Sequence, residues 1–276
     1  MTVAGGIDIG ASATKVALLN ERGDLLGSAV LRSGVDFALS ASRGLDQALK
    51  EAGLEPHQVR VIFTCGYGRN NVPFAHQTRT EIAAHATGAF RHFPQALTVI
   101  DIGGQDNKII KVDASGRRTS FKMNRKCAAG TGAFLEEMAL RLDLELKHFD
   151  SLARRAEDEA ILGSYCTVFT GSEVLSKIRE GVAVEALIKG LFRSVVKRVL
   201  EMDVMEGQVV MTGGVVAHNP YLAEMMQEAL GQPVLVPPRP QLTGAEGAAW
   251  LALKSLQQGN RAPGADQQRP DDDLTG

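Results

Sequence analysis

The stretch that decides the fold occurs twice, as GIDIGASATK at residues 6–15 and as VIDIGGQDNK at residues 99–108. The two copies align without a gap, and their aspartate, isoleucine, glycine and lysine coincide. Each copy predicts an apolar strand that ends at an acid, then a glycine turn and a second strand, which together form a β-hairpin. The tip of such a hairpin presents backbone N–H groups beside a carboxylate, a combination that suits a phosphate and a hydrated divalent cation.

The rest of the chain alternates between helix and strand, which predicts the α/β class. The segments expected are a helix at 36–52, a strand at 59–65, a glycine-closed strand at 209–215, a helix at 221–230, a strand from 234 and a helix at 242–253. We expect a first subdomain at 1–95 and a second at 96–256. Residues 257–276 are rich in Pro, Gly, Gln and Asp, which predicts a disordered tail.

Composition narrows the class of protein. The 276 residues are 44% hydrophobic and 22% charged with a formal net charge of −2, as expected for a soluble globular protein large enough for two domains. Without a basic stripe, neither a nucleic acid nor a membrane surface is an expected partner. No apolar stretch approaches the ~20 residues that span a bilayer, and we expect a cytoplasmic protein.

Two of the three cysteines occur in unusual contexts. Cys127 lies in KCAAGTGAFL and Cys166 in SYCTVFTGSEV, and each is expected at the entrance of a helix, where unpaired N–H groups favour a thiolate. Two thiolates are half of a four-cysteine site, which a symmetric homodimer would complete. An iron–sulfur cluster, a zinc ion and simple burial all remain open on this pattern. Cys65 is expected to be a core thiol.

Other nucleotide-binding motifs are absent. No GxxxxGK[ST] P-loop occurs, and GTGAFL at 130–135 has leucine where a dinucleotide fingerprint needs its third glycine. We therefore expect a nucleotide between the two hairpin tips, with Thr212-Gly213-Gly214 near the base or sugar.

Asp8, Asp101 and Gln105 are the candidate catalytic residues. The candidate nucleotide-binding residues are Gly10, Ala11, Ser12, Lys15, Gly103, Gly104, Gln105, Gly213 and Gly214. Lys15 and Lys108 are alternatively solvated strand residues, and Gln105 alternatively builds the turn.

The paired hairpins and the late TGG strand resemble the actin, hexokinase and heat-shock-chaperone ATPase fold, in which duplicated ribonuclease-H-like domains hold the nucleotide in the cleft between them. Four motifs identify a branch: IDIGGQD at 100–106, MNRKCAAGTG at 123–132, YCTVF at 165–169 with SEV at 172–174, and VMTGGV at 210–215. Together they resemble the ATP-dependent activators of 2-hydroxyacyl-CoA dehydratases and the ATPase subunits of benzoyl-CoA reductases. The similarity runs from about Gly6 to about Leu253.

This resemblance implies an ATP-hydrolysing protein that binds ATP, ADP and Mg²⁺ and carries one 4Fe-4S cluster per dimer. Cys127 and Cys166 are the implied ligands, joined by the same pair from a second protomer, either an identical or a homologous subunit. The implied partners are a dehydratase or benzoyl-CoA reductase catalytic component, and a ferredoxin or flavodoxin as electron donor. Arg125 and Thr170-Gly171 stand where the family often has an acid and Ala-Glu, which predicts less acidic surroundings for the cluster.

Two other functions fit the same fold. A small-molecule kinase, for example of amino sugars, would need a catalytic base beside a substrate cleft and would have no use for paired cysteines. An actin-like filament or chaperone module would need a polymerisation surface or a peptide-binding domain, and the sequence contains no sign of either.

Overall fold

Two five-stranded sheets with the same topology organise the computed structural model, which describes residues 2–163 and 166–259. The first sheet has the order β3-β2-β1-β4-β5, and the second has the equivalent order β8-β7-β6-β9-β10. In each sheet the first three strands are antiparallel and the last two are parallel to the central strand. The strands are β1 (Val3–Ile9), β2 (Ala13–Asn20), β3 (Leu25–Arg32), β4 (Val59–Cys65), β5 (Gln77–Thr78), β6 (Leu97–Ile102), β7 (Asn107–Val112), β8 (Arg118–Asn124), β9 (Gln208–Thr212) and β10 (Val234–Leu235).

The register of the two hairpins is the same. Asp8 pairs with Lys15 across β1 and β2, and Asp101 pairs with Lys108 across β6 and β7. The duplication and the α/β class predicted from the sequence are therefore confirmed. Both copies place an acid as the second-to-last residue of the central strand, close to the turn.

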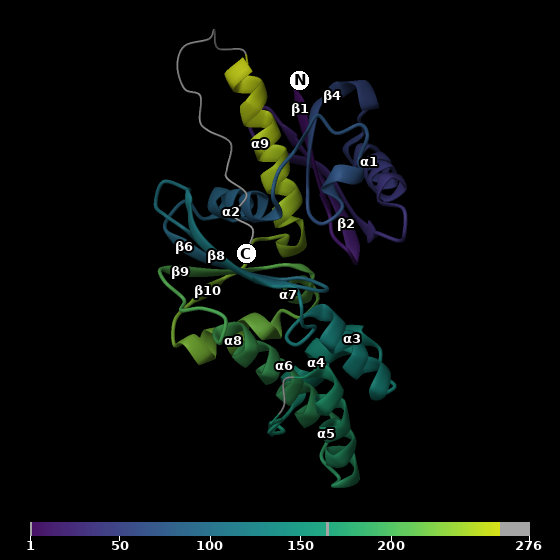
Figure 1. Ribbon diagram of the computed structural model, residues 1–276, viewed down its shortest axis with the longest axis vertical. Helices are drawn as coiled ribbons and strands as arrows, with labels where there is room; N and C mark the ends of the chain where they lie inside the picture. The colour runs from purple at the N-terminus through teal and green to yellow at the C-terminus, as the bar shows by residue number, and fades with distance from the viewer. Residues whose placement is uncertain (1, 164–165, 260–276) are drawn as a thin grey trace.

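Helices cover both faces of the first sheet (Figure 1). α1 (Phe37–Ala52) packs on one face, where the Asp36 side chain accepts a hydrogen bond from the Leu39 N–H and so caps the helix. α9 (Thr243–Gly259) packs on the other face. α2 (Glu81–His92) crosses α9 and also lies on the second sheet, so it stands between the two halves of the molecule. At this crossing a Cβ on Gly247 would collide with the carbonyl oxygen of Ala84.

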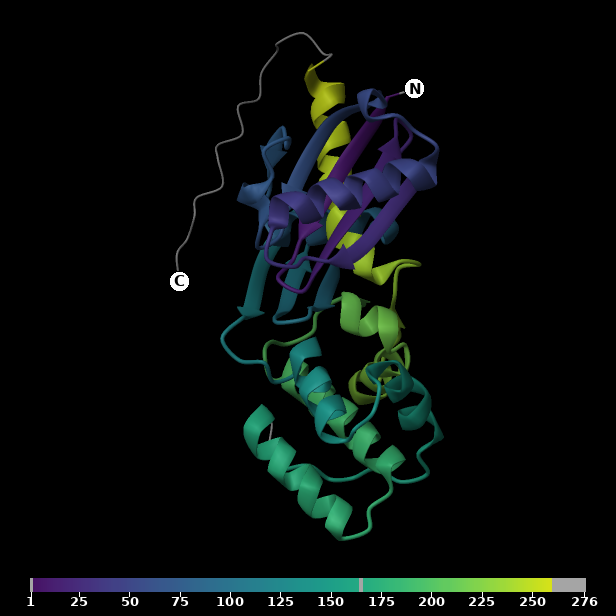
Figure 2. The ribbon, with the colours of Figure 1, turned by 90° about the vertical axis from the view of Figure 1, so that its right-hand side faces the viewer.

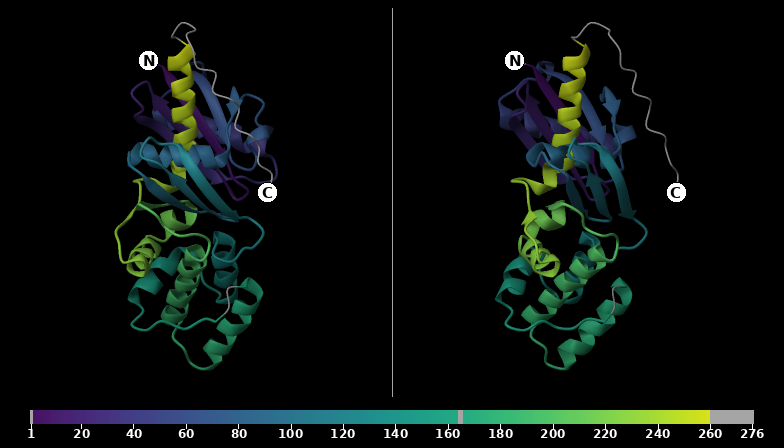
Figure 3. Two further views of the ribbon diagram at one scale, coloured as in Figure 1. Left: turned by 60° about the vertical axis from the view of Figure 1, so that its left-hand side comes forward. Right: turned by 90° about the vertical axis from the view of Figure 1, so that its left-hand side faces the viewer.

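A helical layer covers the opposite face of the second sheet (Figures 2 and 3). Its members are α3 (Gly132–Arg141), α4 (Phe149–Arg155), α5 (Thr167–Arg179), α6 (Val184–Leu200), α7 (Gly214–His218) and α8 (Tyr221–Leu230). α6 is the buried centre of this layer, whereas α5 lies at its edge and buries only Thr170, Gly171 and Val174. Short 3-10 helices occur at Pro56–Gln58, Arg69–Asn71, Leu146–His148 and Pro240–Leu242.

Most predicted elements have the expected bounds, and β4 and α8 match their predictions at both ends. The last helix is longer than predicted, because Leu253 and Leu256 continue its contact with the first sheet and the helix ends only at Gly259. The expected tail therefore begins too early at residue 257, and its part at 260–276 lies outside the described residues.

The division of the chain at residues 95 and 96 stays a proposal, and α9 returns to the first sheet. No helix in the described ranges is long and apolar enough to cross a membrane.

Candidate functional site

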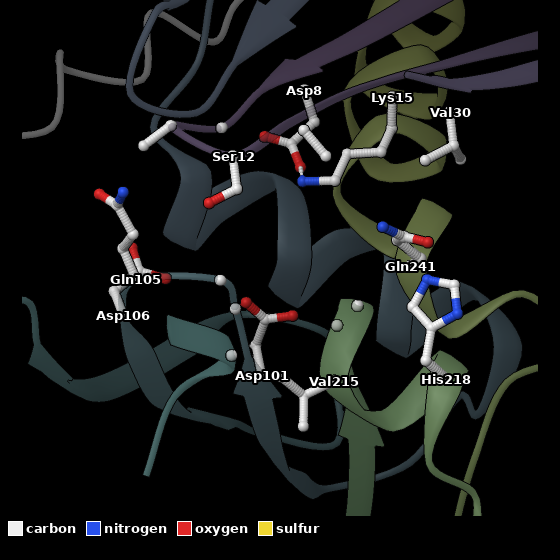
Figure 4. Close-up of a pocket in the computed structure, with 18 of the residues that line it drawn as sticks. Asp8, Ser12, Lys15, Val30, Asp101, Gln105, Asp106, Val215, His218 and Gln241 are labelled. Carbon is white, nitrogen blue, oxygen red and sulfur yellow. Dashed lines mark hydrogen bonds and ion pairs between the residues drawn. The ribbon is translucent and has the colours of Figure 1, made fainter. Parts of the chain in front are cut away.

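A cavity of about 680 Å³ lies between the two sheets, where the two hairpin turns face each other. Both acids, the turns at residues 10–12 and 103–105, and the glycines at 213 and 214 line it. Figure 4 shows Asp8, Ser12 and Lys15 entering from the first sheet and Asp101 entering from the second. Every residue predicted for catalysis or nucleotide binding thus borders one cavity, and the individual roles remain predictions.

The first hairpin holds a nearly buried ion pair. Asp8 is 4% exposed, and its Oδ2 accepts a hydrogen bond from Lys15 Nζ at 3.1 Å. Burial alone would raise the pKa of Asp8, but Lys15 and His85 outweigh it and hold that pKa below its ordinary value. The same pairing outweighs burial for Lys15 and raises its pKa. The first acid is therefore kept ionised at neutral pH.

The second hairpin repeats this pair with more partners. Lys108 Nζ lies 3.2 Å from Asp101 Oδ2 and 2.7 Å from Asp106 Oδ1, and Thr212 Oγ1 donates to Asp101 Oδ1 at 2.9 Å. Burial opposes ionisation of Asp101, but His85, Lys108 and the Thr212 hydrogen bond hold its pKa well below the ordinary value. Glu81 lies 3.6 Å from Lys108 Nζ, and burial raises the pKa of this carboxyl. Both lysines are thus buried partners of acids rather than solvated strand residues.

The two hairpin tips approach each other closely. A Cβ placed on Gly104 would lie 2.5 Å from Ser12 Oγ and 2.9 Å from Ser12 Cβ, so no side chain fits between the two domains at this point. Ser12 points from the first hairpin toward the centre of the cavity (Figure 4). Backbone N–H groups from both domains can therefore contact one phosphate chain.

The opposite end of the cavity is formed by Gly213, Gly214, Val215, His218 and Gln241 (Figure 4). Gly213 has φ 101°, and a Cβ there would collide with the backbone of Ile102, so this turn requires glycine. His218, the last residue of α7, lines this end of the cavity.

Gln241, Glu81 and His85 also line the cavity, although no sequence motif indicated them. Glu81 and His85 are four residues apart on α2, a spacing that places them on one helix face. This spacing was the one available signal for these two. The spacing did not indicate that this face of α2 would border the cavity.

The two candidate metal ligands are exposed. Cys166 is the N-cap residue of α5, as expected for a thiol at a helix entrance. Cys127 lies four residues before Thr131, the N-cap of α3, so the expectation is wrong for it: the helix dipole acts only over the first turn. The loop from β8 to α3 and the start of α5 lie on the same side of the helical layer (Figures 2 and 3).

The loop that carries Cys127 is hydrogen-bonded to the second hairpin. Gly132 N donates to Gly103 O at 2.9 Å, and Ala133 N donates to Gly104 O at 2.7 Å. The first amides of a helix lack partners within the helix, and here the turn of the nucleotide cavity supplies them. Asn107 Nδ2 adds a third bond, to Gly130 O at 2.9 Å.

No group of three or more His, Cys, Asp or Glu side chains in the described ranges is placed to bind a metal ion. The described residues of one chain therefore supply two exposed candidate thiols, half of the four that a tetrahedral or cubane thiolate site requires. These residues fit such a site only if a second copy of the pair faces them.

Two ribonuclease-H-like halves with acid-bearing glycine hairpins around a shared cavity define a nucleotide-binding protein of the actin and hexokinase fold. The chain belongs to the BadF/BadG/BcrA/BcrD ATPase family, which it matches over residues 6–252.

Characterised relatives cover almost the whole chain. It is 37% identical to the 2-hydroxyisocaproyl-CoA dehydratase activator of Clostridioides difficile, over 93% of this chain and 97% of that protein. It is 40% identical to the activator of lactoyl-CoA dehydratase of Anaerotignum propionicum, over 91% and 98%. The crystal structure of (R)-2-hydroxyglutaryl-CoA dehydratase component A from Acidaminococcus fermentans superposes with a TM-score of 0.89 at 35% identity, covering 93% of this chain and all of that one. A glucokinase of the ROK family from Streptomyces griseus, with a TM-score of 0.56 and 13% identity over 91% of this chain and 98% of that one, shares the fold alone.

Proposed function

We propose that this ATPase is an electron-transfer protein that uses ATP hydrolysis to deliver a low-potential electron to the catalytic component of a 2-hydroxyacyl-CoA dehydratase or benzoyl-CoA reductase. The names of its relatives support this partner class. The observation that carries the proposal is the set of hydrogen bonds between the second hairpin and the loop and helix that follow Cys127. They connect the nucleotide cavity to a candidate cluster ligand.

On the nucleotide side, the turns at 10–12 and 103–105 bind the phosphates of ATP through their N–H groups. The ionised, buried carboxylates of Asp8 and Asp101 fit a hydrated Mg²⁺, which would neutralise phosphate charge. Lys15 and Lys108 now neutralise these acids. When a cation takes over that role, the ammonium groups become available to the phosphates. Gln105, at the tip of the second hairpin, is the residue that we propose orients the attacking water.

On the electron side, Cys127 and Cys166 of two protomers hold one 4Fe-4S cluster between them, and the cluster supplies one-electron chemistry when bound. The exposure of both thiols supports a ligand set that closes only in a dimer. A ferredoxin or flavodoxin is the proposed donor. The second protomer is an identical or a homologous subunit.

Transmission follows from the hydrogen bonds at the base of α3. A shift of Gly103 and Gly104 on nucleotide exchange moves Gly132 and Ala133, and with them the loop that carries Cys127. A coupling free energy of about 1–3 kcal/mol corresponds to about 40–130 mV for one electron. Tuning of the potential is small on this scale, so we propose that the movement also controls docking to the electron acceptor.

An anaerobic preparation tests the proposal through its iron and sulfide content, its visible spectrum before and after dithionite, its mass in solution and its ATPase activity. We expect one 4Fe-4S cluster per dimer. Cys127→Ala and Cys166→Ala should lose the cluster, whereas Cys65→Ala, the matched control at the buried cysteine, should keep it. Full iron content in a monomer, no iron in anaerobic protein, or ATP consumption that depends on an added sugar would each contradict the proposal.

A further inference from the structure

His85 lies between the two acids of the cavity, although it belongs to neither hairpin. It comes from α2, the helix between the two halves, and it is 5% exposed. Its Nδ1 lies 3.3 Å from Asp101 Oδ1. In the described part of the chain this nitrogen has no hydrogen-bond partner of normal geometry, so a buried polar atom is directed at the second acid without being aligned to it. Such atoms are rare in folded proteins because they are costly to bury.

The other ring nitrogen and the first acid lie near the same glycine. A Cβ on Gly244, in the first turn of α9, would lie 2.7 Å from His85 Nε2 and 3.2 Å from Asp8 Oδ2. The imidazole and the Asp8 carboxylate thus both border the space that this glycine leaves open. A larger residue at position 244 would displace the ring.

The other contacts of the Asp101 carboxylate leave an acceptor position on Oδ1 that the imidazole can use. Its Oδ2 contacts Lys108 and its Oδ1 accepts from Thr212. A carboxylate oxygen has two acceptor positions, so Oδ1 can also accept from an Nδ1–H after a small rotation of the ring. The other donors to Asp101 come from strands of its own sheet. A bond from His85 on α2 would add a donor from a different direction and so fix the plane of the carboxylate.

We propose that His85 is a positioning residue, which orients Asp101 through Nδ1 and keeps it aligned with Asp8 across the two domains. The proposal rests on the ATPase function above and assigns part of it to α2. It predicts an order among substitutions. Asparagine places its amide nitrogen near the position of Nδ1, whereas glutamine places it near that of Nε2, so His85→Asn should retain more activity than His85→Gln.

The kinetic test compares ATP hydrolysis by the whole protein and its variants. We expect His85→Ala to lower kcat about 10- to 100-fold, the range of a hydrogen bond to a charged group, with a smaller change in KM for ATP. His85→Asn should recover much of this loss and His85→Gln little. His92→Gln is the matched control: it is on the same helix and its Nε2 lies 2.6 Å from the buried Glu246, but it does not line the cavity. It should keep the wild-type kcat.

A second measurement does not depend on hydrolysis. In protein labelled with ¹⁵N-histidine, the Nδ1 proton of His85 should give a resonance that is protected from exchange and that is lost in Asp101→Ala, while the His92 signals persist and report an intact fold. If the wild-type protein shows the protected resonance but hydrolyses no ATP, the proposed function is refuted, whereas the His85–Asp101 contact is supported. An active wild type whose kcat survives His85→Ala, or in which glutamine rescues better than asparagine, would overturn the inference.

Discussion

Gly104 of the second hairpin lies against Ser12 of the first so closely that a methyl group on Gly104 would be 2.5 Å from Ser12 Oγ. The two domains approach each other here through a glycine backbone and a small side chain. The separation of the two hairpin tips is therefore set by the absence of a Cβ at position 104.

Gly104→Ala should weaken ATP binding, because the methyl group forces the hairpin tips apart. We expect Kd for ATP to rise about tenfold or more, equivalent to about 1.4 kcal/mol, as measured by calorimetry. The double variant Gly104→Ala/Ser12→Gly removes the atoms that the methyl meets and should regain part of the affinity relative to Ser12→Gly alone. Unchanged affinity in Gly104→Ala would show that the tips separate without cost.

Lys108→Met should destabilise the fold more than Lys15→Met. The Lys108 side chain is 4% exposed and has Asp101, Asp106 and Glu81 within 4.0 Å. Lys15 is 16% exposed and, among the described residues, forms an ion pair with Asp8 alone. Removing one partner of a buried ion pair costs about 3–5 kcal/mol. Urea unfolding of both variants measures the difference, and equal losses would contradict this asymmetry between the repeats.

Acid should destabilise the protein through Asp8 and Asp101. The pKa of each is lower in the folded chain than the ordinary value of 3.8. The unfolded state therefore binds protons first, and the stabilisation is fully present above pH 3.8 and is lost as the pH falls through the folded pKa. The melting temperature should decline below about pH 4. Asp101→Asn should show a shallower decline, and a slope equal to that of the wild type would contradict the assignment.

Thiol reagents should distinguish the three cysteines of the metal-free protein. Cys127 and Cys166 are exposed, whereas Cys65 is buried under α9, and burial raises the pKa of its thiol well above the ordinary value of 9.0. Iodoacetamide should therefore modify two sites in the native protein and the third only after denaturation. Peptide mass spectrometry locates the adducts. Native labelling of Cys65 would show that the α9 contact opens readily.

The hairpins could be predicted from sequence because their chemistry is local. Each acid and its lysine are seven residues apart and meet across a short turn, so one strand pairing fixes both the register and the ion pair. The start of α1 also depends on local chemistry, because the Asp36 side chain accepts a hydrogen bond from the Leu39 N–H. α8 begins directly after Pro220, whose fixed φ suits the entry of a helix. The duplication extended this reasoning to the topology of both sheets.

The last helix and the cavity histidine could not be predicted in the same way. α9 continues to Gly259 because the first sheet, whose strands lie between residues 3 and 78, offers an apolar face. His85 has the sequence context of an ordinary helix residue. Its place between Asp8 and Asp101 depends on how α2 packs between the two sheets.

The sequence by itself determined the duplicated acid hairpins, the α/β class and the two cysteine motifs, since each depends on residues close together in the chain. Only the tertiary structure decided that Gly104 meets Ser12, that His85 lies beside Asp101 and near Asp8, and that the second hairpin is bonded to the helix after Cys127. The residues in these contacts are far apart in the chain, so no local sequence pattern predicts that they meet. Their geometry is fixed by the packing of the two sheets and their helices.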